Sequence, residues 1–133
     1  MTNEEKYTYW LTHAQYDIDT AGAMLASGRW FYVVFMCQQA VEKLVKGLYT
    51  VYIDDNVPRV HNIKTLFERF EDKLTVPILP EVFQLFDVLS SHYLGSRYPD
   101  FMNDPAKNVS EGNAKNIFNK SKEVFQWLQT LKP

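Results

Sequence analysis

The chain of 133 residues contains little of what disulfides, metal sites and membrane spans are made from. Its single cysteine, Cys37, excludes a disulfide within the chain. Three scattered histidines leave no material for a zinc site built from cysteine pairs or from histidines spaced i, i+4. The longest apolar run, residues 30–37, is too short to cross a bilayer. We therefore expect a cytoplasmic protein that is not embedded in a membrane and holds no metal ion and no cofactor.

A strong charge of one sign is also missing, because Lys and Arg total 14 against 16 for Asp and Glu. The chain therefore lacks the basic excess of a nucleic-acid coat protein, although a local basic patch is compatible with this count. Aromatic residues are abundant, at 15% of the chain within a hydrophobic fraction of 46%. This composition predicts a single domain over residues 1–133 with a real core. So many aromatic side chains are hard to bury within one protomer of this size, which predicts a homodimer.

Apolar residues recur at three- and four-residue steps along most of the chain, which is typical of amphipathic helices. Residues 2–5 match a capping box, and Ser27 and Gly28 end the helix that it starts. Asn62 is a predicted N-cap, and Pro80 suits the first turn of a later helix. The predicted helices span residues 3–26, 30–53, 63–74, 81–93 and 110–131.

The chain has no pair of strand-like segments with a turn signal between them, no glycine-rich phosphate loop and no internal repeat. The sequence therefore predicts an all-α fold, an antiparallel up-and-down helical bundle of four long helices plus one short helix. The longest irregular stretch is predicted over residues 96–109, which include Pro99 and Pro105.

The predicted second helix carries a polar strip beside its apolar stripe. Gln38, Glu42 and Lys46 follow one another at i, i+4 and i+8, with Gln39 and Lys43 next to them. Amide and ammonium groups can hydrogen-bond and neutralise phosphate oxygens, so Gln39, Lys43 and Lys46 are candidate ligand-binding residues. The alternative is a solvated surface, since Glu42 and Lys46 have the favourable orientation of a surface pair worth about 0.3–0.5 kcal/mol.

A second candidate is the run Ser96-Arg97-Tyr98-Pro99-Asp100 after the predicted fourth helix. Pro99 disfavours helical geometry at Tyr98, so the chain should turn here and hold Arg97 and Tyr98 near the bundle surface. A planar guanidinium can clamp a phosphate through two hydrogen bonds, and a phenol ring can stack on a base. Alternatively, Arg97 pairs with Asp100 or caps helix carbonyls while Tyr98 fills a gap.

Two histidines are candidates for acid–base chemistry. His61 lies at the start of the predicted third helix, where a helix N-terminus favours bound anions, although an isolated histidine there is more often structural. His92 precedes Arg97 by five positions. His13 is interpreted as structural or exposed, and Cys37, on the apolar stripe of the second helix, as an inert small hydrophobe.

The residues that combine these features are Ala14, Asp17, residues 35–46, His61, Leu66 and residues 96–100. Their types, order and spacing resemble the HEPN domain, a family named for higher eukaryotes and prokaryotes nucleotide-binding. The resemblance covers nearly the whole chain. Its most specific parts are the Gln-Gln-Ala-x-Glu-Lys core and its combination with Arg-Tyr-Pro.

The resemblance implies an antiparallel helical bundle, commonly a homodimer, often encoded beside a minimal nucleotidyltransferase with which it acts as a pair. In several such pairs the HEPN member is a metal-independent ribonuclease toxin and the nucleotidyltransferase is its antidote. Those ribonucleases carry an Arg followed by four to six residues and then a His. This sequence departs from that pattern, because none of its arginines is followed by a His at that distance, and His92 and Arg97 occur in the reverse order.

Three functional hypotheses follow. The leading one is a non-catalytic homodimer that binds a nucleotide or nucleic-acid phosphate and acts with a nucleotidyltransferase in a toxin–antitoxin-like pair. Its predicted ligand contacts are Gln39, Lys43, Lys46, Arg97 and Tyr98. The second is a metal-independent ribonuclease in which His61 or His92 meets Arg97, so that the histidine moves the proton of the ribose 2′-hydroxyl while Arg97 stabilises the phosphate charge. The third is a structural adaptor whose polar strip is solvated surface.

Overall fold

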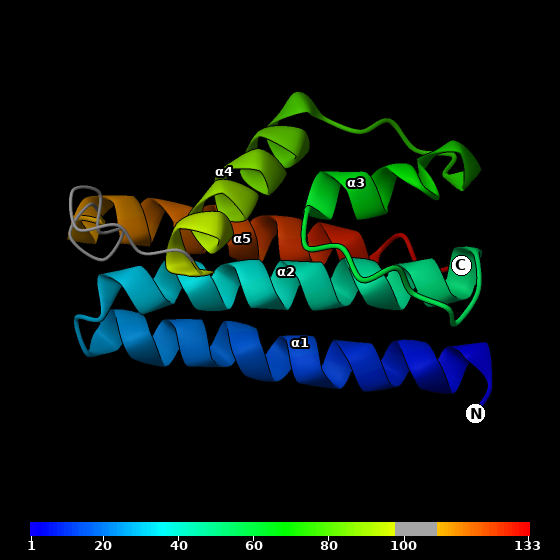
Figure 1. Cartoon of the computed structure of the whole chain (residues 1–133), viewed down its shortest axis with the longest axis horizontal. Helices are drawn as coiled ribbons and strands as arrows, with labels where there is room; N and C mark the ends of the chain where they lie inside the picture. Colours follow the sequence, from blue (N-terminus) through cyan, green and yellow to red (C-terminus); the bar gives the residue numbers. More distant parts are fainter. Residues whose placement is uncertain (98–108) are drawn as a thin grey trace.

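Helix α2 is the central element of the fold and contacts every other α-helix (Figure 1). In this computed structural model the backbone is described for residues 1–97 and 109–133, and the side chains for residues 1–92 and 109–133. The α-helices are α1 (Asn3–Ala26), α2 (Trp30–Tyr52), α3 (Ile63–Glu68), α4 (Pro80–Arg97) and α5 (Glu111–Gln129), and a 3-10 turn, η1 (Glu71–Lys73), follows α3. No strand occurs in the described backbone, so the predicted all-α bundle of four long helices and one short helix is confirmed.

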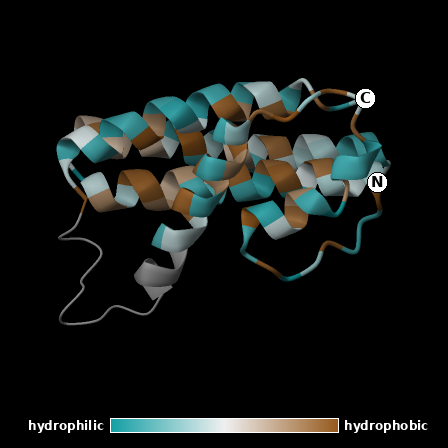
Figure 2. Ribbon diagram, turned by 90° about the horizontal axis from the view of Figure 1, so that it is seen from above, coloured by the Kyte–Doolittle hydropathy of each residue, from teal (hydrophilic) through white to brown (hydrophobic). Residues whose placement is uncertain are grey.

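Helices α1 and α2 lie side by side in opposite directions, and α5 packs along another side of α2 (Figure 1). The short α3 lies over the second half of α2. Helix α4 crosses this layer at a steep angle instead of running along it. Hydrophobic and hydrophilic residues alternate along the helices (Figure 2), as the amphipathic pattern predicts. Within the described part of the chain, no helix has the length and hydropathy that crossing a bilayer requires.

Local sequence signals fix the first two helices. Thr2 Oγ1 accepts from Glu5 N at 3.1 Å, and Glu5 Oε1 accepts from Thr2 N at 3.2 Å, which is the predicted capping box. Gly28 has φ 77°, a left-handed conformation that allows the chain to reverse between α1 and α2. Within α2, Gly47 lets α1 come close, since a Cβ atom there would lie 2.9 Å from Trp10 Cβ.

Much of the aromatic content is buried within the protomer. Phe67, Phe70 and Phe86 are fully buried, and the Phe67 ring lies 5.2 and 5.4 Å from the other two rings. Tyr52 stacks on Phe70 with ring planes 7° apart. Tyr9, Tyr16 and Tyr32 are the aromatic side chains that are more than half exposed among the described residues. The aromatic argument for a homodimer therefore depends on far fewer rings than the composition indicated.

Two helix ends differ from the sequence prediction by more than two residues. Helix α3 stops at Glu68 instead of continuing to residue 74, because the chain leaves α-helical geometry where Phe70 turns into the core. Helix α4 continues past Gly95 to Arg97 instead of ending near residue 93. A glycine inside a helix costs only about 1 kcal/mol, so it does not stop the helix. The described part of α4 ends at Arg97. The sequence predicts that Pro99 disfavours helical geometry at the next residue, Tyr98.

Both ends of the chain lie at the same end of the bundle (Figure 1), and exposed ion pairs connect the segments there. Lys6 Nζ lies 2.7 Å from Asp55 Oδ2, and Lys132 Nζ lies 2.5 Å from Glu4 Oε1. Hydrogen bonds from these lysines lower the pKa of the Asp55 and Glu4 carboxyls. The Tyr52 hydroxyl also donates to the carbonyl of Leu131.

Candidate functional site

The polar strip of α2 is buried, whereas the surface alternative required it to be solvated. Gln38 Nε2 donates to Glu42 Oε1 at 2.9 Å, and Lys46 Nζ donates to Glu42 Oε2 at 3.0 Å. The side chains of Glu42 and Lys46 are 7% and 14% exposed, and Gln38 is fully buried. In an isolated amphipathic helix the polar side faces water. Here α2 is central, and other helices cover its polar side as well, so the strip is buried.

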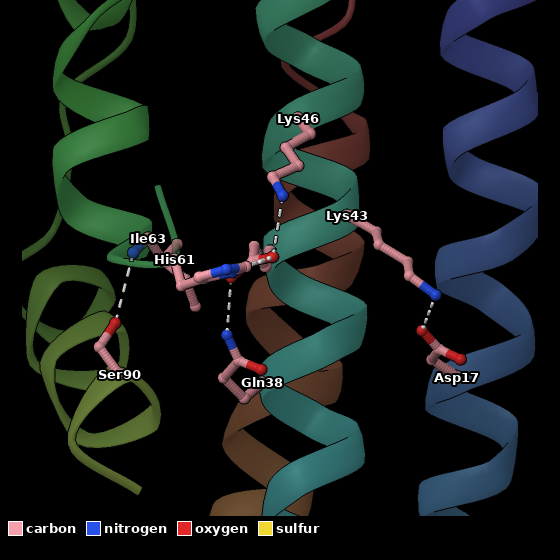
Figure 3. A network of polar contacts seen from close by, with 8 residues as sticks. Asp17, Gln38, Lys43, Lys46, His61, Ile63 and Ser90 are labelled. Atoms are coloured by element: carbon pink, nitrogen blue, oxygen red, sulfur yellow. Dashed lines mark hydrogen bonds and ion pairs between the residues drawn. The ribbon is translucent and has the colours of Figure 1, made fainter. Parts of the chain in front are cut away.

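His61 joins this array from the segment between α2 and α3. Its Nδ1 lies 3.3 Å from Glu42 Oε1 and 3.4 Å from Glu42 Oε2, and its side chain is 44% exposed. Asn62, the next residue, caps α3 by accepting from Thr65 N at 3.0 Å, as its position in the sequence predicts. His61 is therefore held between a buried carboxylate and the protein surface (Figure 3).

Helix α4 is tied to the same region. Ser90, which is 9% exposed, accepts a hydrogen bond from Ile63 N at 3.3 Å. This bond satisfies one of the backbone N–H groups that the start of α3 leaves unpaired. It also places the middle of α4 beside the chain that carries His61 (Figure 3).

Lys43 points to the opposite side of α2, toward α1 (Figure 3). Its Nζ lies 2.7 Å from Asp17 Oδ2, and the Lys43 and Asp17 side chains are 29% and 9% exposed. The candidate residues Lys43 and Lys46 thus pair with different carboxylates, Asp17 of α1 and Glu42 of α2. Each ammonium group already contacts a carboxylate, so a phosphate at either lysine has to compete with that carboxylate.

The remaining candidate residues lie apart from the array or outside the described side chains. Gln39 is half-buried on α2. Arg97 is the last residue of α4, and its side chain lies outside the described residues, as does the whole of Tyr98. His92 donates from Nδ1 to the carbonyl of Val88 at 2.9 Å, so its ring is held by its own helix and not by Glu42.

His92 also lines a groove between α4 and α5 with a volume of about 440 Å³. Its floor is apolar and includes Leu85, Val88 and Ile117, whereas Glu81 and Lys120 lie among its polar residues. Val88 is 40% exposed. The groove offers apolar contact area but no cluster of cations for a phosphate among the described side chains.

Cys37 is fully buried on α2, and burial raises the pKa of its thiol to about 12. Burial and the raised pKa agree with the interpretation of Cys37 as an inert hydrophobe, because the thiolate is the reactive form. In the parts of the chain that the structure describes, no group of three or more His, Cys, Asp or Glu side chains lies close enough to hold a metal ion.

Sequence reasoning did not identify Glu42 as the centre of the site, and it missed Ser90. One signal for Glu42 was available. The apolar stripe of α2 is unusually wide, with buried residues at 40, 41, 44, 45, 47 and 48. A helix with that pattern is surrounded on most sides, so a carboxylate within it must find internal partners.

Comparison with known proteins identifies the family. The family model of the HEPN domain matches residues 7–131. A crystal structure of ST0689, described as an archaeal HEPN homologue, is 26% identical, with a TM-score of 0.74 over 96% of this chain and 98% of that chain. The crystal structure of TT1696 from Thermus thermophilus is 20% identical, with a TM-score of 0.78 over 94% of this chain and 97% of that chain, and it shows the shared fold. No curated protein matches the chain. With the family model covering nearly its whole length, the chain belongs to the HEPN domain family.

Proposed function

We propose that this HEPN domain protein binds the phosphate of a nucleotide or RNA at the surface around His61 and the end of α4, without cleaving its ligand. The observation that supports the proposal is the Glu42–His61 contact, which holds a half-exposed imidazole in a fixed place at the surface. Arg97 follows Ser90 by seven residues, or two helical turns, on the helix that packs against this region. In this proposal Arg97 and Lys46 supply positive charge and His61 supplies a hydrogen-bonding nitrogen.

The other three predicted ligand contacts, Tyr98, Gln39 and Lys43, do not all have the same part in the proposal. Tyr98 follows Arg97 directly and keeps its predicted role as a stacking platform. Lys43 pairs with Asp17 of α1 and contributes only if a ligand displaces Asp17, and Gln39 lies one helical turn before Lys43 on α2. A non-catalytic role agrees with the sequence, in which no Arg is followed by a His after four to six residues.

Binding can be tested by fluorescence anisotropy with a labelled RNA oligonucleotide over a range of salt concentrations, and with ATP as a competitor. Arg97→Ala should weaken binding and reduce the slope of log K against log salt by about 0.7–1, because one phosphate contact is lost. Arg69→Ala is the matched control, since Arg69 is an exposed arginine at the end of α3. Equal affinity in the wild type and in Arg97→Ala contradicts the proposed site.

The same Glu42–His61 contact favours a second candidate, a ribonuclease with a rearranged Arg–His site. A carboxylate beside Nδ1 is the arrangement that prepares a histidine to act as a general base. The imidazole would take the proton of the ribose 2′-hydroxyl, and the 2′-oxygen would bond to phosphorus. The bond from phosphorus to the 5′-oxygen would break, and that oxygen would leave with a proton from water. Arg97 would stabilise the extra negative charge on the phosphate.

An RNA-cleavage assay with a metal chelator present separates the two candidates. The binding proposal predicts no cleavage by the wild type. Cleavage that is lost in Arg97→Ala and in His61→Asn, with helicity unchanged, establishes the ribonuclease instead. His61→Asn is the informative variant because the asparagine amide can still donate to Glu42 from the position of Nδ1 but has no equivalent of Nε2.

The proposal also includes a homodimer and a nucleotidyltransferase partner, both of which family membership supports. Sedimentation at micromolar concentration tests the dimer, and a clean monomer would contradict it. Co-expression with a nucleotidyltransferase encoded beside the gene tests the partnership, and separate elution of the two proteins would contradict it. If neither RNA nor ATP binds while the partner does, the adaptor hypothesis replaces the binding proposal.

A further inference from the structure

The groove between α4 and α5 has one helix along each side. Its lining residues on α4 recur at helical steps from Glu81 to His92, and those on α5 do the same from Asn113 to Val124. Each side therefore extends over about three helical turns, or roughly 16 Å. A groove of this length between two helices has the shape into which a third helix packs.

The α4–α5 groove lies on the side of α4 that faces away from the His61 region. Val88 and His92 line the groove, and each is two positions from Ser90, which contacts the start of α3 at Ile63. Two positions along an α-helix are about 200° apart, so the groove is opposite the side by which α4 meets α3. A ligand in this groove does not use the Glu42–His61 contact, and the inference is independent of the proposed phosphate site.

The apolar part of the groove is open to water near the middle of α4. Leu85 and Ile117 line the groove and are buried, whereas Val88 is 40% exposed. An amphipathic helix that lies in a groove places apolar side chains, spaced three and four residues apart, against such a floor. Covering Val88 removes apolar surface from water, which favours binding.

Three charged side chains line the groove without an ion-pair partner among the described side chains, namely Glu81, Lys120 and Glu123. Helix α4 runs toward the end of the molecule at which α5 begins (Figure 1), so Glu81 and Glu123 both lie toward the other end of the groove. Two carboxylates against one ammonium group give this part of the groove a net negative charge. It therefore suits a partner that carries Lys or Arg.

We propose that the α4–α5 groove is a docking site for an amphipathic helix of a partner protein, with one apolar side flanked by Lys or Arg. The apolar side chains of that helix contact Val88 and the floor of the groove. Its basic side chains pair with Glu81 and Glu123, which is the charge pattern that a nucleic acid lacks.

The test uses a synthetic helical peptide of about four turns, built from Leu and Lys in amphipathic order, and a second peptide in which every Lys is replaced by Glu. Fluorescence anisotropy measures the affinity of each for the full chain. The wild type should bind the Leu/Lys peptide more tightly at low salt, by about threefold to tenfold for two ion pairs at the edge of the groove. In ¹H–¹⁵N spectra the amide signals of residues 81–92 and 113–124 should shift on binding.

Two sets of variants test the apolar and the charged contacts separately. Glu81→Lys combined with Glu123→Lys should reverse the preference, so that the Leu/Glu peptide binds more tightly. Glu68→Lys combined with Asp72→Lys is the matched control, because it reverses two exposed carboxylates on α3 and η1 and should leave the preference unchanged. Val88→Asp should weaken the binding of both peptides while helicity stays the same, since Val88 is partly in water.

Several results would overturn the proposal. They are the absence of binding by either peptide, equal affinity for both, equal effects of the two charge reversals, and signal changes outside α4 and α5. Loss of a dimer in sedimentation of Val88→Asp would identify a second copy of this chain as the occupant. Nuclear Overhauser contacts between Val88 and residues 98–108 in the free protein would identify that segment instead. Either finding would also overturn the proposal.

Discussion

Lys43 and Asp17 form an ion pair across the α1–α2 interface, with Lys43 Nζ 2.7 Å from Asp17 Oδ2. The two groups are unequally exposed, at 29% for Lys43 and 9% for Asp17. Lys43, which the sequence suggested as a ligand contact, therefore also connects α2 to α1 through this pair. Any ligand that uses Lys43 has to replace this contact.

The unequal exposure of this pair predicts unequal costs of removing either partner. Lys43→Gln leaves a nearly buried carboxylate without its cation, which should cost about 2–3 kcal/mol. Asp17→Asn leaves a lysine that can reach water, which should cost about 1 kcal/mol. The free energy of unfolding from urea titration measures both. Equal losses, or a larger loss for Asp17→Asn, contradict this account of the pair.

Glu42 is predicted to be important for stability as well as for His61. Glu42→Gln removes the charge partner of Lys46, which is 14% exposed, and should lower the free energy of unfolding by about 1–3 kcal/mol. Lys115→Gln is the matched control, because it breaks another i, i+4 pair with Glu111 in which both side chains are more than half exposed. That control should change stability by at most about 0.5 kcal/mol. Similar effects of the two substitutions would show that the α2 array is as solvated as the surface pair.

Gly47 is predicted to set the spacing of α1 and α2. In Gly47→Ala the new methyl group meets Trp10 Cβ, a backbone-proximal atom that cannot rotate away, so we expect a loss of about 1–3 kcal/mol. Gly112→Ala in α5 is the control, since its Cβ comes only within 4.0 Å of Ser110 Oγ. That substitution should stabilise the protein by about 0.5–1 kcal/mol through helix propensity alone. Thermal unfolding of the two variants should therefore shift in opposite directions.

The Cys37 thiol is predicted to be unreactive in the folded protein. With its pKa raised to about 12, its thiolate population at pH 8 is lower than that of an ordinary cysteine by about 10³-fold. Modification by a disulfide reagent should be slow under native conditions and fast in urea. Because the folded-state pKa is the higher one, this thiol's contribution to stability is complete below its ordinary range and is lost as pH rises toward 12. Rapid labelling of the native protein at pH 8 would contradict the burial of Cys37.

The parts of the fold that could be predicted from sequence are those determined by neighbouring residues. The Thr2 capping box, the Asn62 N-cap and the start of α4 at Pro80 depend on contacts within a few residues, and all are present. Gly95 did not mark the end of α4, because the helix continues through it.

The candidate site could not be predicted in the same way, because its contacts join distant parts of the chain. His61 meets Glu42 across 19 positions, and Ser90 meets Ile63 across 27. The i, i+4 spacing of Glu42 and Lys46 is compatible with a surface and with an interior. Which of the two applies depends on how many helices surround α2, a property of the whole fold.

The pairs Lys6–Asp55 and Lys132–Glu4 also have a consequence for local motion. The carboxylate side chains of Asp55 and Glu4 are 63% and 73% exposed, so dissolved ions screen these pairs more strongly than the buried contacts of Glu42. Raising the ionic strength should therefore loosen the end of the bundle that carries both chain termini before it affects the middle of α2. Amide hydrogen exchange at low and high salt would show this as a gradient of protection along α2, with its last turn opening first.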